Sequence, residues 1–169
     1  MTTTPIEPAL VVGEPTVVAE NLITPWSVVF VREAPLISSR DTGEILELVG
    51  SQTRVVGEVP GVVHSGEAGL LGLAVDDQNR LYAYSTGANS NRIHRFALTG
   101  QPGSFALGSA ELILDGIPAA RTHDGGRIHG DRHDRDFVGL PVHRAVDSLA
   151  GGGIGPGLVA MDPIADAHR

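Results

Sequence analysis

The sequence predicts an all-β protein built from two copies of one four-stranded unit and the start of a third. The first copy runs from Thr24 to Val59, and the second runs from Glu67 to Asp115. Each copy contains four short apolar runs separated by turn residues, at a strand spacing of about eight to twelve residues. A repeat of roughly 40–45 residues with four strands is typical of a β-propeller blade. Propellers close with about four to eight blades, so the sequence predicts an incomplete ring of about two four-stranded antiparallel blades.

In the first copy, the expected strands are Trp26–Val31, Leu36–Ser39, Ile45–Val49 and Arg54–Val59. Polar residues and a glycine in Arg40-Asp41-Thr42-Gly43 predict a tight reversal between the second and third of them. Residues 1–15 show no clear period and form a lead-in. Thr16–Glu20 is a candidate outer strand, paired with the other end of the ring.

In the second copy, the expected strands are Leu70–Val75, Leu81–Ser85, Ile93–Leu98 and Glu111–Leu114. Two of these segments alternate with period two, as half-buried antiparallel strands do. The nearly continuous apolar run Leu70–Val75 instead predicts an inner strand that is covered on both faces. Alternation at this spacing also fits a β-sandwich or a barrel. The matching order of strands and turns in the two copies favours the propeller.

The third unit opens at His123–Ile128, and then the character of the sequence changes. Residues 129–136 are dense in charge and imidazole, and residues 149–157 are mostly glycine. Neither segment has a strand period, so 129–169 is predicted to be an irregular, weakly ordered tail. Such an abrupt change suggests a reading-frame shift as the origin of the tail. His129 and His133 have a spacing that a divalent metal could use, but no metal ligand is assigned because no third ordered ligand is evident.

Composition excludes several classes of function. The formal net charge of −8 disfavours a nucleic-acid backbone or an anionic membrane surface as partner. Cysteine is absent, which excludes disulfides, thiolate metal sites and a cysteine nucleophile. All twelve Lys and Arg positions are Arg, which excludes Schiff-base chemistry. No secretory signal begins the chain, and no run reaches the roughly 18 apolar residues that would span a membrane.

Several motifs together resemble the glucose/sorbosone dehydrogenase family of soluble quinoprotein sugar dehydrogenases. They are Val18–Phe30, Arg40–Gly43, Gly66–Val75, Asn91–Phe96, Asp115–Pro118 and Thr122–Ile128. The resemblance covers residues 16–128, in the order and spacing of the family. It implies a six-bladed propeller that binds pyrroloquinoline quinone (PQQ) and Ca²⁺ and oxidises an aldose sugar at its anomeric carbon.

The resemblance also assigns roles to individual residues. His123 falls on the general base of the family, and a neutral imidazole suits that role because its pKa lies near neutrality. Glu67 falls on a pocket position that hydrogen-bonds sugar hydroxyls. Arg127 is either a pocket residue or a surface arginine at the start of a strand. Members of the family often act in the periplasm or outside the cell.

Departures from the family pattern leave the substrate and the activity open. Glucose-oxidising members carry an acid where this chain has Thr122, and a glutamine where it has Glu67. In the family, later blades supply the calcium ligands and the basic groups that hold the quinone, so this chain is expected to be inactive alone. Two alternatives remain: a non-catalytic propeller that binds protein or carbohydrate, and a nonfunctional truncation whose exposed strand edges aggregate. The sequence does not predict an oligomeric state.

Overall fold

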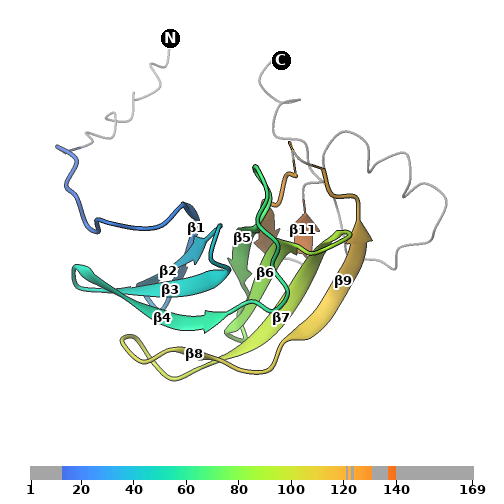
Figure 1. Cartoon of the computed structure of the whole chain (residues 1–169). Coiled ribbons are helices and arrows are strands. Elements are labelled where there is room, and N and C mark those ends of the chain that lie inside the picture. Colours follow the sequence, from blue (N-terminus) through green and yellow to red (C-terminus); the bar gives the residue numbers. More distant parts are fainter. Residues whose placement is uncertain (1–12, 121, 123, 131–136, 140–169) are drawn as a thin grey trace, which may run out of the picture.

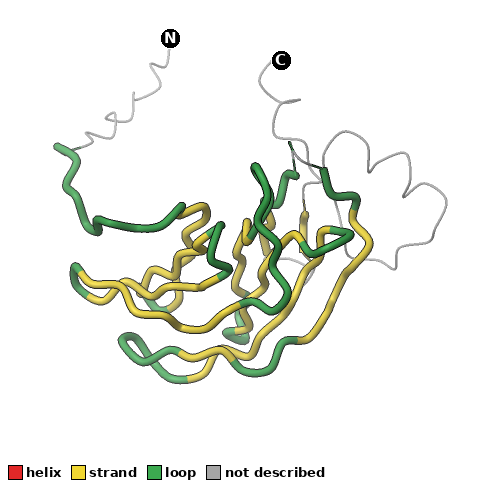
Figure 2. Tube along the Cα trace, in the orientation of Figure 1, coloured by secondary structure: helices red, strands yellow, loops and turns green. Residues whose placement is uncertain are grey.

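The computed structural model describes residues 13–120, 122, 124–130 and 137–139. These residues form strands and loops, and none of them lies in a helix (Figure 2). This part of the chain therefore offers no helix that could cross a membrane. The all-β prediction is confirmed.

The first sheet is a four-stranded antiparallel meander with its strands in chain order. Its strands are β1 (Pro25–Val31), β2 (Ala34–Ser39), β3 (Glu44–Val49) and β4 (Gln52–Glu58). All four coincide with predicted strands and differ from them by no more than two residues at either end. The predicted turn joins β2 to β3, and the N–H of Gly43 donates to the carbonyl of Ser39 at 3.0 Å.

The second sheet has five strands, and three of them pair with the same strand. Its strands are β5 (Leu70–Val75), β6 (Arg80–Thr86), β7 (Asn91–Thr99), β8 (Ala106–Leu107) and β9 (Glu111–Ile117). β5 and β6 form a hairpin, β6 pairs with β7, and both β8 and β9 pair with β7. Two residues are too few to show a period, so the sequence did not predict β8.

A third, two-stranded sheet follows, made of β10 (Ile128–Gly130) and β11 (Phe137–Gly139). The predicted irregular tail 129–169 therefore contains strand residues at 129–130 and at Phe137–Gly139. Three residues that pair with a preceding strand leave no detectable alternation. The remainder of the predicted tail lies outside the described residues.

The predicted outer strand Thr16–Glu20 is not formed. This segment belongs to no strand, and Val17 and Val18 are exposed. Strand propensity depends on packing and on a neighbouring edge, and no described strand pairs with the segment. In Figure 1 it belongs to the blue stretch that leads away from the first sheet.

The two large sheets pack side by side, with β1 and β2 in contact with β5 (Figure 1). Apolar side chains fill the space between the sheets, including Leu36, Ile45, Leu70, Leu73, Leu81, Phe96 and Phe105. A second cluster on the far face of the second sheet joins Leu71, Tyr82, Tyr84 and Ile93 to Ile128 of β10. β5 thus contributes to both clusters, and the prediction that it is covered on both faces is confirmed.

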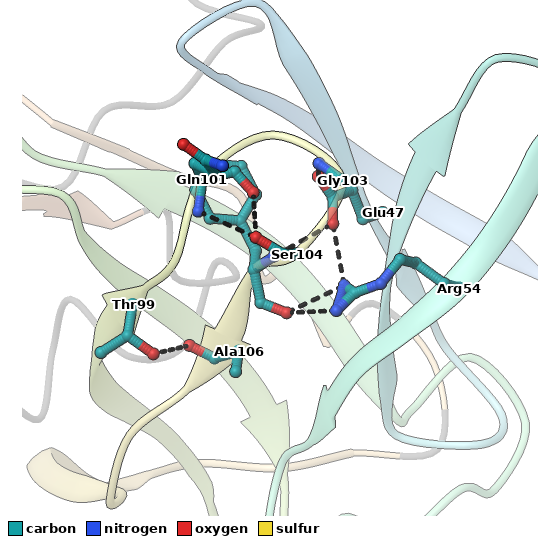
Figure 3. A network of polar contacts seen from close by, with 8 residues as sticks. Glu47, Arg54, Thr99, Gln101, Gly103, Ser104 and Ala106 are labelled. Atoms are coloured by element: carbon teal, nitrogen blue, oxygen red, sulfur yellow. Dashed lines mark hydrogen bonds and ion pairs between the residues drawn. The ribbon is translucent and has the colours of Figure 1, made fainter.

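A buried carboxylate ties the two sheets together at their outer side (Figure 3). Glu47 of β3 is 0% exposed and accepts hydrogen bonds from Arg54 Nη1 at 2.8 Å, from the N–H of Gly103 and from the N–H of Phe105. Both terminal nitrogens of Arg54 also donate to the carbonyl of Phe105, at 2.8 and 2.7 Å. Burial of a charge is costly unless it is paired and hydrogen-bonded, and here both conditions are met. These hydrogen bonds attach the loop between β7 and β8 to the first sheet.

Candidate functional site

A small pocket of about 140 Å³ lies at the seam between the two sheets. The described residues that line it are Trp26, Arg40, Glu67, Leu71, Asp124 and Gly125. They combine one aromatic ring, one cation and two carboxylates. A larger hollow of about 490 Å³ beside residues 17–21 and 51–53 contains one charged side chain, Glu20, and offers less chemistry.

Hydrogen bonds of two serine hydroxyls link β1 and β2 to β5. They hold the start of β1, which carries Trp26, near Leu71 of β5. Ser38 Oγ donates to the carbonyl of Leu71 at 2.7 Å and accepts from the N–H of Ser27 at 3.0 Å. Ser27 Oγ in turn accepts from the N–H of Leu73 at 3.3 Å. These bonds satisfy backbone groups where the two strands meet without forming a ladder.

The backbone of Arg40 connects the segment before β1 with the loop that carries Glu67. Its N–H donates to the carbonyl of Thr24 at 3.0 Å, and its carbonyl accepts from the N–H of Leu70 at 2.9 Å. A Cβ at Gly69 would lie 2.3 Å from that carbonyl oxygen, so only glycine permits this approach. The positions of Arg40 and Glu67 are therefore fixed relative to each other.

An ion-pair cluster holds the side chain of Arg40. Its Nε donates to Asp41 Oδ1 at 2.8 Å, and His64 Nδ1 lies 3.2 Å from the same oxygen. His64 Nδ1 also lies 3.0 Å from the carbonyl of Ala68, which identifies this nitrogen as the one that carries the proton. The hydrogen bond from Arg40 holds the pKa of Asp41 below its ordinary value.

Asp124 anchors the far wall of the pocket. It is 2% exposed, and its Oδ1 accepts from the N–H of Ala120 at 2.7 Å and from Asn91 Nδ2 at 3.4 Å. The Tyr84 hydroxyl donates to the backbone carbonyl of Asp124 at 3.2 Å. Burial, aided by the charge of Asp124, raises the pKa of Tyr84, so this hydroxyl keeps its proton. Oδ2 of Asp124 has no hydrogen-bond partner in the part of the chain that the structure describes.

Two glycines allow the loop after Asp124 to lie directly against β5. Gly126 has a φ of +90°, a conformation that other residues rarely adopt. A Cβ at Gly72 would lie 2.0 Å from the carbonyl oxygen of Gly126. The Gly-Leu-Leu-Gly-Leu and His-Asp-Gly-Gly-Arg motifs are thus two sides of one contact.

The predicted site residues have different outcomes. Glu67 is exposed and lines the pocket, whereas Arg127 is exposed at the start of β10 and is not among the lining residues. His123 lies outside the described residues, directly before Asp124 in sequence. The sequence prediction missed Trp26, Arg40 and Asp124, although all three belong to the motifs that carried the family resemblance. No spacing rule indicates that residues so far apart share one pocket.

The described residues contain no group of three or more His, Asp or Glu side chains that could hold a metal ion. The described residues that line the pocket include one arginine and two carboxylates, which could hydrogen-bond a neutral hydroxyl-bearing molecule.

Comparison with known proteins relates this arrangement to one family. Residues 22–142 match the family described as Glucose / Sorbosone dehydrogenase. The PQQ-bound form of Aldose Sugar Dehydrogenase from Streptomyces coelicolor is similar at 36% identity over 71% of this chain, with a TM-score of 0.64. An oxidoreductase of Thermus thermophilus, described as a glucose dehydrogenase, is similar at 31% identity over 73% of this chain, with a TM-score of 0.59.

This chain covers 38% of the length of each of these two structures. No curated protein matches it. The family match extends over most of the chain and includes every residue that lines the pocket. The chain therefore belongs to the glucose/sorbosone dehydrogenase family.

Proposed function

We propose that the chain is part of a quinoprotein oxidoreductase that oxidises an aldose sugar at C1. The observation that carries this proposal is the pocket, which gathers Glu67 and Asp124 at the seam of the two sheets, with His123 adjacent to Asp124 in sequence. The similarity to a PQQ-bound aldose sugar dehydrogenase supports the same reaction.

In this proposal, His123 accepts the proton of the C1 hydroxyl, and Glu67 accepts a hydrogen bond from another hydroxyl of the sugar. Bound PQQ would supply the two-electron acceptor for the hydride of C1, and loss of that hydride and of the hydroxyl proton would convert the hemiacetal into a lactone. The described residues fit the sugar in this scheme. In this proposal, later blades of the whole enzyme would hold the quinone and Ca²⁺.

We further propose that the two large sheets are two blades of a six-bladed propeller and that β10 and β11 begin a third. The side-by-side packing of the sheets and the contact of β5 with both β1 and β10 support this interpretation. Because the chain covers 38% of each relative's length, we expect no turnover from the chain alone.

A chimera tests the proposal. Residues 1–128 would be joined to the remaining length of the Streptomyces coelicolor enzyme, and dye reduction would be followed with glucose, PQQ and Ca²⁺. We expect turnover by the chimera, and a loss of about 10²–10⁴-fold in kcat when His123→Ala removes the base. An unchanged rate in His123→Ala would contradict the catalytic assignment. A folded chimera that binds PQQ without turnover would favour a binding module.

A further inference from the structure

We propose that Arg40 and Trp26 are specificity-determining residues of the pocket and that together they recognise a pyranose monosaccharide. The inference rests on the proposed function and names two contacts that the family resemblance did not assign. It is drawn from the contacts of each side chain and from the charges of the described residues that line the pocket.

The described residues use only part of the hydrogen-bonding capacity of Arg40. A guanidinium has five N–H donors. Among the described residues, Arg40 uses one of them, from Nε to Asp41 Oδ1 at 2.8 Å. Its side chain is 25% exposed and lines the pocket. The terminal nitrogens are thus available to a hydroxyl or ring oxygen in the pocket.

The orientation of Arg40 is fixed before any ligand arrives. Asp41 fixes the guanidinium, and the backbone bonds to Thr24 and Leu70 fix the main chain on both sides. A side chain that is already held loses less conformational freedom on binding. Such preorganisation suits a recognition residue, and Arg40 differs from the similarly held Arg80 in that it lines the pocket.

Trp26 supplies the flat surface of the site. It lines the pocket and is 39% exposed. A pyranose has one face of C–H groups and an edge of hydroxyls. The ring of Trp26 would cover the C–H face, while Arg40 and Glu67 would bond the hydroxyl edge.

Charge narrows the class of ligand further. Glu67 and Asp124 both line the pocket, so an anionic ligand would face two carboxylates and one guanidinium. A single water needs only about 10–15 Å³ of such space, so the pocket is large enough for a group of several atoms. A neutral polyhydroxyl ligand would avoid this repulsion and could still accept hydrogen bonds from Arg40.

The experiment is a titration of the full 169-residue chain with D-glucose. Trp26 is the only tryptophan, so its emission reports on the pocket directly. We expect a saturable change in emission, and at least a tenfold weaker affinity in Arg40→Gln. For Trp26→Ala, which lacks the fluorophore, ligand-observed NMR should show a similar loss of affinity.

Arg80→Gln is the matched control. Arg80 forms the same kind of pair, from Nε to Asp76 Oδ2 at 2.6 Å, and does not line the pocket. Thermal unfolding of each variant would show that it is folded, and the affinity of Arg80→Gln should equal that of the unmodified chain. No saturable binding by the unmodified chain, or equal affinities in Arg40→Gln and Arg80→Gln, would overturn the inference.

The chimera separates this inference from the proposed function. Turnover with an unchanged KM after Arg40→Gln would contradict the inference and leave the function intact. Arg40-dependent glucose binding by a chimera without turnover would contradict the function and leave the inference intact.

Discussion

The two large sheets share one sequence pattern but differ in what covers them. The first sheet packs one face on the second sheet and leaves Val28, Phe30 and Val55 on its other face 54%, 68% and 53% exposed. The second sheet is covered on one face by the first sheet and on the other by Ile128 of β10. The repeat thus specifies a sheet, and the neighbours of each sheet decide which side chains are buried.

The strand register aligns apolar residues in one row across this face of the first sheet. Val28 pairs with Ile37, Ile37 with Leu46, and Leu46 with Val55, so one apolar row crosses all four strands; it is exposed at Val28 and Val55, whereas Ile37 is 5% exposed. An antiparallel sheet that faces water normally alternates apolar and polar residues. This row therefore has the character of a packing surface, as the propeller proposal requires.

The largest expected effect is on stability, and it distinguishes a buried phenylalanine from an exposed one. Phe96 is 2% exposed in the core between the sheets, and Phe30 is exposed on the open face of the first. We expect Phe96→Ala to lower the free energy of unfolding by about 3–5 kcal/mol, because it removes buried apolar area and leaves a cavity. Phe30→Ala should change it by less than about 0.5 kcal/mol. Chemical denaturation measures both, and equal losses would mean that the open face is covered in solution.

The next largest loss of stability is expected when the contact between the two sheets at Glu47 is removed. Glu47→Ala leaves the N–H groups of Gly103 and Phe105 and the guanidinium of Arg54 without their acceptor, so we expect a loss of about 2–4 kcal/mol. The exposed pair of Arg95 and Glu111 is the control, and Glu111→Ala should cost about 1 kcal/mol or less. Similar losses in thermal unfolding would show that Glu47 does not join the sheets.

The sequence predicted most of the fold because strands and turns leave local signals. Leu70–Val75 matched β5 in full, since a continuous apolar run reflects burial on both faces. Thr16–Glu20 failed because a strand also needs an edge to pair with, which no local pattern contains. For the site, motif resemblance indicated Glu67, but the proximity of Trp26, Arg40 and Asp124 arises from packing between distant segments.

A smaller effect should distinguish two glycines with positive φ. Gly126→Ala forces a left-handed conformation and places a Cβ 2.6 Å from that of Leu71, whereas the space around Gly116 is open. We expect a cost of about 1–3 kcal/mol for Gly126→Ala, and the smaller part of that range for Gly116→Ala. Only the former should weaken glucose binding, because the loop of Gly126 bounds the pocket. Comparable losses of stability and affinity in the two variants would contradict the close contact with β5.

The smallest effect is a pH dependence in the second sheet. Burial, aided by the charge of Arg92, lowers the pKa of His94 below its ordinary value of 6.5. The unfolded chain therefore binds this proton more readily, so the stability contribution is present above that value and is lost as pH falls below it. In His94→Leu, the drop in melting temperature between about pH 7.5 and 5.5 should be smaller than in the unmodified chain. An identical drop would show that His94 is not the group responsible.

Amide hydrogen exchange along the purified chain tests the central claim most directly, since it reports how well each strand is covered. The account predicts the slowest exchange in β5 and its partner β6, with clearly faster exchange in β1 and β4 of the first sheet. Equal protection in β1 and β5, or rapid exchange throughout the second sheet, would contradict it.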